Sequence, residues 1–264
     1  MKLIWLPTFR CNLRCSYCVA RSLPMKHSTE LKPQVWIDFF NNSPVEIESV
    51  AISGGEPTVY PGFKEVLDNT SFKFTVDTNC RIPPSTFIND GNIDRLISLN
   101  LSLHFNPDHY CAQWFWGALD WFETTFPGVK KVQTTVVSTQ RELESEIAQY
   151  KDRASAYNCN NCAVVSVFDD SFMFKSKGIP RKPDRWSPNC DSGTDYLTIL
   201  ADGTIYRCLG HAYHEVNPMG NLMYKGWDVR FSNIRPCYDV VCTACDLGNK
   251  SIYKVSEGDQ IIGP

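Results

Sequence analysis

The chain lacks several features that would assign it to a class at once. Its 264 residues contain no apolar run of 18 or more, and "MKLIWLPTF" is too short and too soon interrupted for a signal peptide. A formal net charge of −3 provides no basic field for nucleic acid or an anionic membrane surface. No internal repeat or low-complexity run is present. We therefore expect a cytoplasmic globular protein with a small or neutral substrate.

A fourth cysteine is missing from the most distinctive motif. Cys11, Cys15 and Cys18 follow one another with the spacing C-x3-C-x2-C. In a reducing compartment, clustered thiols are more often metal ligands or redox groups than disulfides. Structural zinc and ferredoxin-type clusters normally take four protein ligands, so three cysteines leave one position open. His27 is the alternative fourth ligand of a zinc site, although it has no partner at finger spacing.

Strand-like and helix-like segments alternate through the first two thirds of the chain. Apolar, β-rich runs predict strands at 2–9, 49–55, 73–79, 99–105, 130–138 and 162–170. Helices are predicted at 33–41, 62–69, 83–97, 107–126 and 140–157. This order predicts an α/β fold with βα units feeding a mostly parallel sheet. Six units indicate a partial (β/α)6 barrel rather than a closed barrel of eight.

The pattern changes after residue 170. We interpret 171–189, which carries prolines and lysines without a clear period, as a connection after a core at 1–170. Segment 190–264 contains five cysteines and a predicted hairpin, "DYLTILADGTIYRC", that turns at Asp202–Gly203. We expect this segment to form a small metal-stapled lobe and a C-terminal tail.

The cysteine motif "CNLRCSYC", with Tyr17 before its last cysteine, resembles that of radical S-adenosylmethionine (SAM) enzymes. "ISGGEPT" after the second predicted strand is similar to the GGE motif of the same superfamily. The resemblance implies a four-iron four-sulfur cluster, with the amino acid end of SAM on the iron that no cysteine binds. It also implies that Gly54, Gly55 and Glu56 lie at the SAM amino group.

Two further segments resemble the superfamily less closely. In "VDTN", Asn79 matches the Thr-Asn-Gly that often ends the third strand, but Cys80 replaces the glycine, so we expect a different turn. "LSLHF" is similar to the Ser-Leu-Asp of the fourth strand. The resemblance places Ser102 near the SAM carboxylate and His104 at the usual aspartate position, where the histidine is either structural or faces substrate.

The C-terminal cysteines resemble the SPASM/twitch extensions of radical SAM enzymes. The resemblance assigns four cysteines to an auxiliary four-iron four-sulfur cluster: Cys190, Cys208, Cys242 and Cys245. The full SPASM pattern has more cysteines, so the shorter twitch form fits better. A zinc ribbon is the alternative for the same four thiols. Cys237 is a fifth thiol, either an alternative ligand or a free group. We assign no function to Cys159 and Cys162.

The resemblance implies reductive cleavage of SAM to a 5′-deoxyadenosyl radical, with electrons from an external donor of flavodoxin or ferredoxin type. We expect hydrogen-atom abstraction from a small molecule such as a sugar or cyclitol derivative, followed by dehydrogenation or epimerisation. In epimerisation Cys237 is the candidate hydrogen-atom donor, with Cys80 and Cys111 as further candidates. Crosslinking or epimerisation of a peptide is an alternative within the superfamily. A non-catalytic iron–sulfur or zinc binding module is the alternative of another class.

Overall fold

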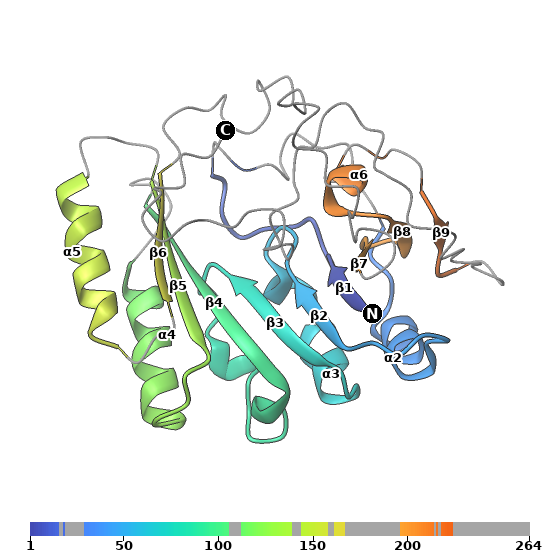
Figure 1. Ribbon diagram of the computed structural model, residues 1–264, viewed down its shortest axis with the longest axis horizontal. Helices are drawn as coiled ribbons and strands as arrows, with labels where there is room; N and C mark the ends of the chain where they lie inside the picture. The colour runs from blue at the N-terminus through green and yellow to red at the C-terminus, as the bar shows by residue number, and fades with distance from the viewer. Residues whose placement is uncertain are drawn as a thin grey trace, which may run out of the picture.

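The computed structural model describes residues 1–15, 18, 29–105, 112–138, 144–157, 161–166, 196–213, 215 and 218–223. Its strands form one sheet with the order β6-β5-β4-β3-β2-β1-β7-β8-β9 (Figure 1). The strands are β1 (Lys2–Trp5), β2 (Ser49–Ile52), β3 (Lys73–Thr78), β4 (Leu96–Phe105), β5 (Val132–Ser138), β6 (Asn161–Ser166), β7 (Tyr196–Ile199), β8 (Thr204–Tyr206) and β9 (Gly220–Asn221). Because β6 and β9 end this order, the described strands form an open sheet.

The first six strands are all parallel, which confirms the predicted α/β class and parallel sheet. Each predicted strand is present, although β1 ends at Trp5 and the chain then continues without regular structure to the cysteines. β4 is longer than predicted, since it begins at Leu96. The carboxyl ends of these strands share one edge of the sheet, and in parallel α/β folds this edge carries the functional loops.

Four helices cover one face of the sheet (Figure 1). They are α2 (Pro33–Asn42), α3 (Phe63–Asp68), α4 (Ala112–Thr125) and α5 (Glu144–Ser155). Short helical turns η2 (Pro57–Val59), η3 (Pro84–Thr86) and η4 (Ile93–Arg95) and the helix α6 (Leu209–Tyr213) complete the described helical segments. None of these helices is both long and apolar enough to span a bilayer.

Aromatic rings fill the core between the sheet and α2. Trp5 of β1 is fully buried, and its ring lies 5.2 Å from the ring of Trp36, 5.3 Å from Phe40 and 6.4 Å from Phe63, between centroids. Such rings bury large apolar areas and gain a further ~0.5–1.5 kcal/mol for each well-placed pair. This packing holds β1 rigidly, and β1 leads directly to the cysteine loop.

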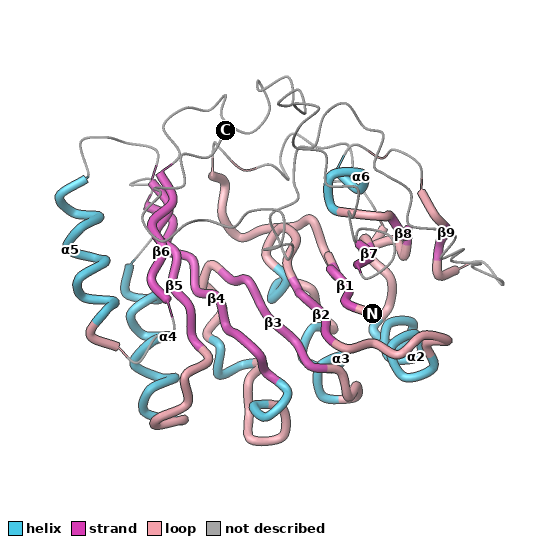
Figure 2. The backbone as a smooth tube through the Cα atoms, in the orientation of Figure 1, coloured by secondary structure: helices cyan, strands magenta, loops and turns pink. Residues whose placement is uncertain are grey.

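The predicted helix at 83–97 is wrong. The chain there forms η3, a loop and η4 before β4 begins, and Figure 2 draws the connection between β3 and β4 mainly as loop. Asparagine side chains hold this loop: Asn89 Oδ1 accepts from the Gly91 N–H at 2.8 Å, and Asn92 Oδ1 accepts from the Asn89 N–H at 3.0 Å. Such bonds compete with helical hydrogen bonding.

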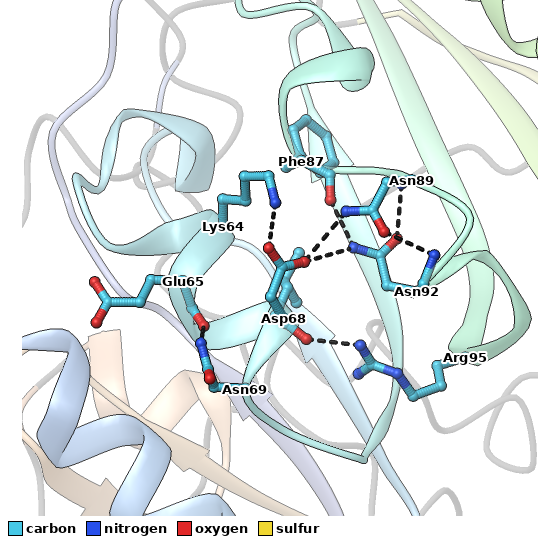
Figure 3. A network of polar contacts seen from close by, with 10 residues as sticks. Lys64, Glu65, Asp68, Asn69, Phe87, Asn89, Asn92 and Arg95 are labelled. Carbon is cyan, nitrogen blue, oxygen red and sulfur yellow. Dashed lines mark hydrogen bonds and ion pairs between the residues drawn. The ribbon is translucent and has the colours of Figure 1, made fainter.

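The same loop is tied to α3 through Asp68. Asn89 and Asn92 donate to Asp68 Oδ1 at 3.2 and 3.3 Å, and Lys64 pairs with the other carboxylate oxygen (Figure 3). Arg95 donates to the Leu67 carbonyl at 2.7 Å. Asp68 ends α3 just before β3 begins, so this network closes the amino-terminal edge of the sheet, away from the cysteine loop.

The predicted hairpin after residue 195 is confirmed. β7 and β8 pair antiparallel, and Gly203 has a φ of +82° in the turn between them, a conformation that favours glycine. In addition, β7 pairs in parallel with β1, so the hairpin extends the sheet of the first six strands. The boundaries of the separate C-terminal lobe stay a prediction, because most of residues 171–264 lie outside the described residues.

A second, smaller core lies on the face of the sheet opposite α2. Ile4 and Leu6 from the start of the chain, and Phe9 near the cysteines, pack with Leu200, Tyr206 and Leu209. Side chains of the hairpin and of α6 therefore pack with those of β1 on this face, the inner face of the sheet. This packing places the segment that contains Cys208 against the base of the cysteine loop.

Candidate functional site

The three N-terminal cysteines lie in a loop at the carboxyl-terminal edge of the sheet. Cys15 is buried, Cys18 is half-buried and Cys11 is the most exposed. Partial burial raises the pKa of Cys11 to about 11, and the nearby charges of Glu56, Cys18 and Cys15 contribute to the shift.

The described residues contain no compact group of ligands for a single metal ion. Among them, no three His, Cys, Asp or Glu side chains converge as ligands of one ion. The four-iron cluster at Cys11, Cys15 and Cys18 stays a prediction. His27, the alternative zinc ligand, lies outside the described residues.

Backbone hydrogen bonds join the start of this loop to the Gly-Gly turn after β2. The Gly55 N–H donates to the Thr8 carbonyl at 3.0 Å, and the Glu56 N–H donates to the Arg10 carbonyl at 2.8 Å. A Cβ on Gly54, whose φ is +133°, would lie 2.5 Å from the Thr8 oxygen, and one on Gly55 would lie 2.3 Å from the Arg10 oxygen. Both glycines are thus needed so that the backbone leading to Cys11 can approach.

Glu56 ties the ends of β2 and β3 together. Its side chain is almost fully buried, with Oε1 accepting from the hydroxyls of Thr58 at 2.6 Å and Thr78 at 2.9 Å. Oε2 accepts from the Asn79 N–H at 2.7 Å. Burial raises the pKa of this carboxyl, while the hydrogen bonds from Asn79, Thr58 and Thr78 oppose the shift. The predicted contact with the SAM amino group stays a prediction.

Asn79 and Arg81 extend from the end of β3 to the cysteine loop. Asn79 Nδ2 donates to Asn12 Oδ1 at 2.8 Å and lies 3.7 Å from the Cys11 sulfur. Arg81 donates to the Asn12 carbonyl at 2.6 Å, and its guanidinium lies 4.8 Å from the centre of the Trp114 ring. These contacts fix the orientation of the residue that follows Cys11.

Cys80 lies in the turn after β3. Its φ of +65° is in the left-handed region that favours glycine, and the expectation that this turn differs from the usual one stays a prediction. The side chain is buried in the core on the helix-covered side, and burial raises the pKa of its thiol. This burial disfavours Cys80 as a hydrogen-atom donor.

Ser102 and His104 lie on the inner face of β4. They alternate with Leu101 and Leu103, which are buried in the core on the helix-covered side, and successive strand residues point to opposite faces. Burial lowers the pKa of His104 to about 4, so its imidazole is neutral at neutral pH. Both residues are thus on the face opposite the helices, and their predicted contacts with SAM or substrate stay predictions.

Sequence reasoning missed a pair that closes the cysteine loop. Arg10 forms a bidentate ion pair with Glu30, with Nε–Oε1 at 2.7 Å and Nη2–Oε2 at 2.8 Å. Arg10 also donates to the Val59 carbonyl at 3.2 Å, and the Thr8 hydroxyl donates to Glu30. Although burial alone would raise the pKa of Glu30, these hydrogen bonds lower it. No sequence spacing indicates this pair, because 19 residues separate its members along the chain.

The C-terminal segment contributes Cys208 and α6. Cys208 is half-buried, and the His211 N–H lies 3.4 Å from its sulfur. Tyr213, at the end of α6, packs against the second core. Burial raises the pKa of Tyr213, and the nearby Cys18 and Asp77 contribute to the shift.

Several predicted site residues lie outside the described residues. They are Tyr17, Cys111, Cys159, Cys190, Cys237, Cys242 and Cys245. Cys162 belongs to β6, but the structure describes only its backbone. The auxiliary cluster therefore has one described ligand candidate, Cys208, and its assignment stays a prediction.

A comparison with family models supports the class indicated by the site. Residues 5–113 match the model of the radical SAM superfamily, and this range contains the three cysteines, the Gly-Gly turn, β3 and β4. The match supports the superfamily and, with it, a four-iron cluster and SAM as cofactors. No curated protein sequence matches the chain.

Solved structures of radical SAM proteins share the fold. Streptococcus suis SuiB bound to its precursor peptide SuiA aligns with a TM-score of 0.55 and 15% identity over 88% of this chain and 64% of SuiB. BtrN in complex with AdoMet and 2-DOIA aligns with a TM-score of 0.53 and 13% identity over 88% of this chain and 82% of BtrN. Native anSMEcpe with bound AdoMet and the Cp18Cys peptide aligns with a TM-score of 0.53 and 12% identity over 88% of this chain and 80% of that protein. The chain thus spans less than two thirds of SuiB, and the likeness concerns the fold.

Proposed function

We propose that this protein is a radical SAM enzyme that abstracts a hydrogen atom from a small molecule and then dehydrogenates or epimerises it. The main support is the position of Cys11, Cys15 and Cys18 at the carboxyl edge of a parallel sheet. Backbone hydrogen bonds connect the residues before Cys11 to the Gly-Gly turn at this edge. The superfamily match over residues 5–113 supports the same chemistry. When bound, a four-iron cluster supplies the electron that cleaves SAM to the 5′-deoxyadenosyl radical.

In this proposal the described residues hold the reactants and exclude water. Cys11, Cys15 and Cys18 would hold the cluster through three of its irons and so would leave a position for the amino acid end of SAM. The Gly-Gly turn and Asn79 position the loop, while Ser102 and His104 face the interior from β4. Tyr17 is a further proposed SAM contact. An external flavodoxin or ferredoxin is the proposed electron donor.

The inner face of the sheet supports a hydroxylated small molecule as substrate. Asn100 and Gln133 are paired in register on neighbouring strands, as are Ser102 and Thr135. All four are half-buried and neutral, and they offer hydrogen-bond donors and acceptors rather than an apolar surface. A sugar or cyclitol derivative would satisfy these groups, and peptide modification is the alternative that the substrate assay below includes.

The outcome of the reaction depends on residues of the C-terminal segment. Dehydrogenation requires the substrate radical to lose one electron and one proton after hydrogen abstraction. An auxiliary cluster, which Cys190, Cys208, Cys242 and Cys245 would hold, would supply an acceptor for that electron. Epimerisation instead requires a hydrogen atom from the opposite face, for which Cys237 is the proposed donor. The two outcomes differ in whether the product has two hydrogen atoms fewer than the substrate.

Anaerobic reconstitution with iron and sulfide, followed by SAM and dithionite, tests the proposal. We expect 5′-deoxyadenosine from the wild-type protein and none from Cys15→Ala, which lacks one cluster ligand. Iron content near eight per chain supports two clusters, whereas a value near four removes the auxiliary one. Absence of 5′-deoxyadenosine with candidate sugars, cyclitols and peptides would favour a non-catalytic binding module. Mass spectrometry of the product distinguishes dehydrogenation from epimerisation.

A further inference from the structure

The sulfur of Cys11 accepts two N–H hydrogen bonds. The Leu13 backbone N–H donates to it at 3.3 Å, and Nδ2 of Asn79, the residue after β3, donates to it at 3.7 Å. Burial raises the pKa of the Cys11 thiol, and the bond from Leu13 opposes this shift. N–H donors favour a negatively charged sulfur, and the thiolate is the form that binds iron. The surroundings of Cys11 therefore fit a metal-ligating cysteine.

Neighbouring groups fix the orientation of the Asn79 side-chain amide. Its Oδ1 accepts from the Arg81 backbone N–H at 3.1 Å, and its Nδ2 donates to Asn12 Oδ1 at 2.8 Å. Because the oxygen already faces an N–H donor, the amide nitrogen is the atom on the side of Asn12 and Cys11. Its two hydrogens supply one bond to each of these residues. The Cys11 sulfur therefore faces a donor and not an acceptor.

The segment that carries Asn79 is anchored on several sides. Asn79 is only 4% exposed, and its backbone N–H donates to the buried carboxylate of Glu56 at 2.7 Å. The Arg81 guanidinium donates to the Asn12 carbonyl at 2.6 Å and lies 4.8 Å from the centre of the Trp114 ring on α4. These contacts connect the cysteine loop to the ends of β2 and β3 and to α4. The N–H···S bond is thus held in place by the fold around it.

Hydrogen bonds to a cysteine sulfur change the redox properties of an iron–sulfur cluster. Reduction adds one electron to the cluster, and part of the added negative charge resides on the cysteine sulfurs. A fixed N–H donor stabilises this charge more in the reduced form than in the oxidised form, so the reduction potential rises. Residues that contact the ligands, and not the metal, commonly tune a metal site in this way.

We propose that Asn79 is a positioning residue that raises the reduction potential of the cluster through its hydrogen bond to Cys11. This inference rests on the proposed function, since it requires a cluster held by Cys11, Cys15 and Cys18. One electron passes from the external flavodoxin or ferredoxin to the cluster, and no bond to Asn79 forms or breaks. By raising the potential, Asn79 makes this electron transfer more favourable.

A redox measurement on the anaerobically reconstituted protein without SAM tests the assignment. It compares the ratio of reduced to oxidised cluster at one applied potential, followed by absorbance and by the electron paramagnetic resonance signal of the reduced form. Asn79→Ala, which removes the donor, should lower this ratio about tenfold, equivalent to a shift of about 59 mV to more negative potential. Asn79→Asp, which places a negative charge beside the sulfur, should lower the ratio further.

Asn12→Ala is the matched control. It removes the same 2.8 Å hydrogen bond to Asn79, but it leaves the donor to Cys11 and the backbone carbonyl that Arg81 contacts. The ratio of reduced to oxidised cluster in this variant should stay within about twofold of the wild-type ratio. A merely structural role of the contact between Asn79 and Asn12 would instead shift Asn12→Ala and Asn79→Ala equally, since both variants lose it.

An unchanged ratio in both Asn79 variants overturns the assignment, and so does an equal shift in Asn12→Ala. Loss of iron or of the cluster absorbance in both Asn79 variants would make Asn79 structural and overturn it too. If the wild type assembles no cluster, or forms no 5′-deoxyadenosine with SAM and dithionite, the proposed function fails first. A wild type that forms 5′-deoxyadenosine, beside Asn79 variants with an unchanged ratio, refutes the redox role alone.

Discussion

Glu56 joins the ends of β2 and β3, and Asp68 joins α3 to the loop before β4, so the two acids connect segments at opposite edges of the sheet and in different electrostatic settings. Glu56 is buried, accepts only from neutral donors, and has a pKa raised by desolvation. Asp68 is partly exposed, pairs with Lys64, and has a lowered pKa because hydrogen bonds from Lys64 and Asn89 outweigh its desolvation. The edge with the cysteines thus depends on tight packing, whereas the other edge depends on solvent-accessible polar contacts. Substitutions should therefore lower the free energy of unfolding much more at the edge with the cysteines than at the opposite edge.

The largest effect is expected at Gly55. The Gly55→Ala substitution would place a Cβ 2.3 Å from the Arg10 oxygen and 2.6 Å from the Phe9 oxygen, and backbone atoms cannot move away as a flexible side chain could. We expect a loss of about 3 kcal/mol in the free energy of unfolding, measured with urea, together with loss of bound iron. Gly117→Ala on α4 is the control. A Cβ there would meet no atom within 4 Å, so alanine should stabilise the helix by up to about 1 kcal/mol. Equal effects at both sites would contradict the comparison.

Replacement of Glu56 by glutamine should have the next largest effect. The glutamine NH2 group would face hydroxyl or N–H donors that now bond to a carboxylate oxygen. Because a buried group left unsatisfied costs about 1–3 kcal/mol, we expect Glu56→Gln to lose that amount of unfolding free energy. Asp68→Asn, at the exposed edge, should lose less. Urea unfolding of both variants under one set of conditions provides the measurement, and a larger loss at Asp68 would reverse our interpretation.

Removal of the Arg10–Glu30 ion pair should lower the free energy of unfolding only slightly and should have a clearer effect on how firmly the cysteine loop retains iron. Arg10 is more than half exposed, so the pair contributes about 1 kcal/mol at most to unfolding. We expect Arg10→Gln and Glu30→Gln each to release iron up to about fivefold faster from the reconstituted protein, followed by its absorbance with a chelator present. A double-mutant cycle should show that the two effects are not additive. Additive effects would mean that the residues act separately.

The smallest effect concerns the pH dependence at Asp68. A carboxyl whose pKa is lowered in the folded state stabilises it fully above the unfolded pKa, which is about 3.9, and loses this contribution as pH falls through the folded value. The difference in unfolding free energy between wild type and Asp68→Asn should therefore be constant near neutral pH and shrink in acid. Urea titrations at neutral pH and between about pH 4 and 3 test this sign. A difference that grows in acid would contradict it.

Sequence patterns predicted secondary structure correctly where the local preference of a segment agrees with its packing in the fold. Apolar periodicity located the six parallel strands, and the Asp-Gly pair located the hairpin turn of β7 and β8. The pattern failed at 83–97, where Asn89 and Asn92 favour side-chain hydrogen bonds that only an acid on α3 completes. Strand alternation in "LSLHF" does place Ser102 and His104 opposite the buried Leu101 and Leu103, so their shared face was within reach of sequence reasoning. The Arg10–Glu30 pair was not, because its two members meet only after the cysteine loop closes.

The sequence by itself determined which motifs and elements this protein has. These are three thiols at cluster spacing, a Gly-Gly-Glu turn after the second strand, and alternating strands and helices. These features are local, and each depends on residue type and short spacing. Only the tertiary structure decided what the residues do for one another. The glycines admit the backbone before Cys11, Glu56 joins two strand ends, and Cys80 adopts a backbone conformation usually left to glycine. Such roles depend on contacts between segments distant in sequence, and those contacts exist only once the sheet has formed.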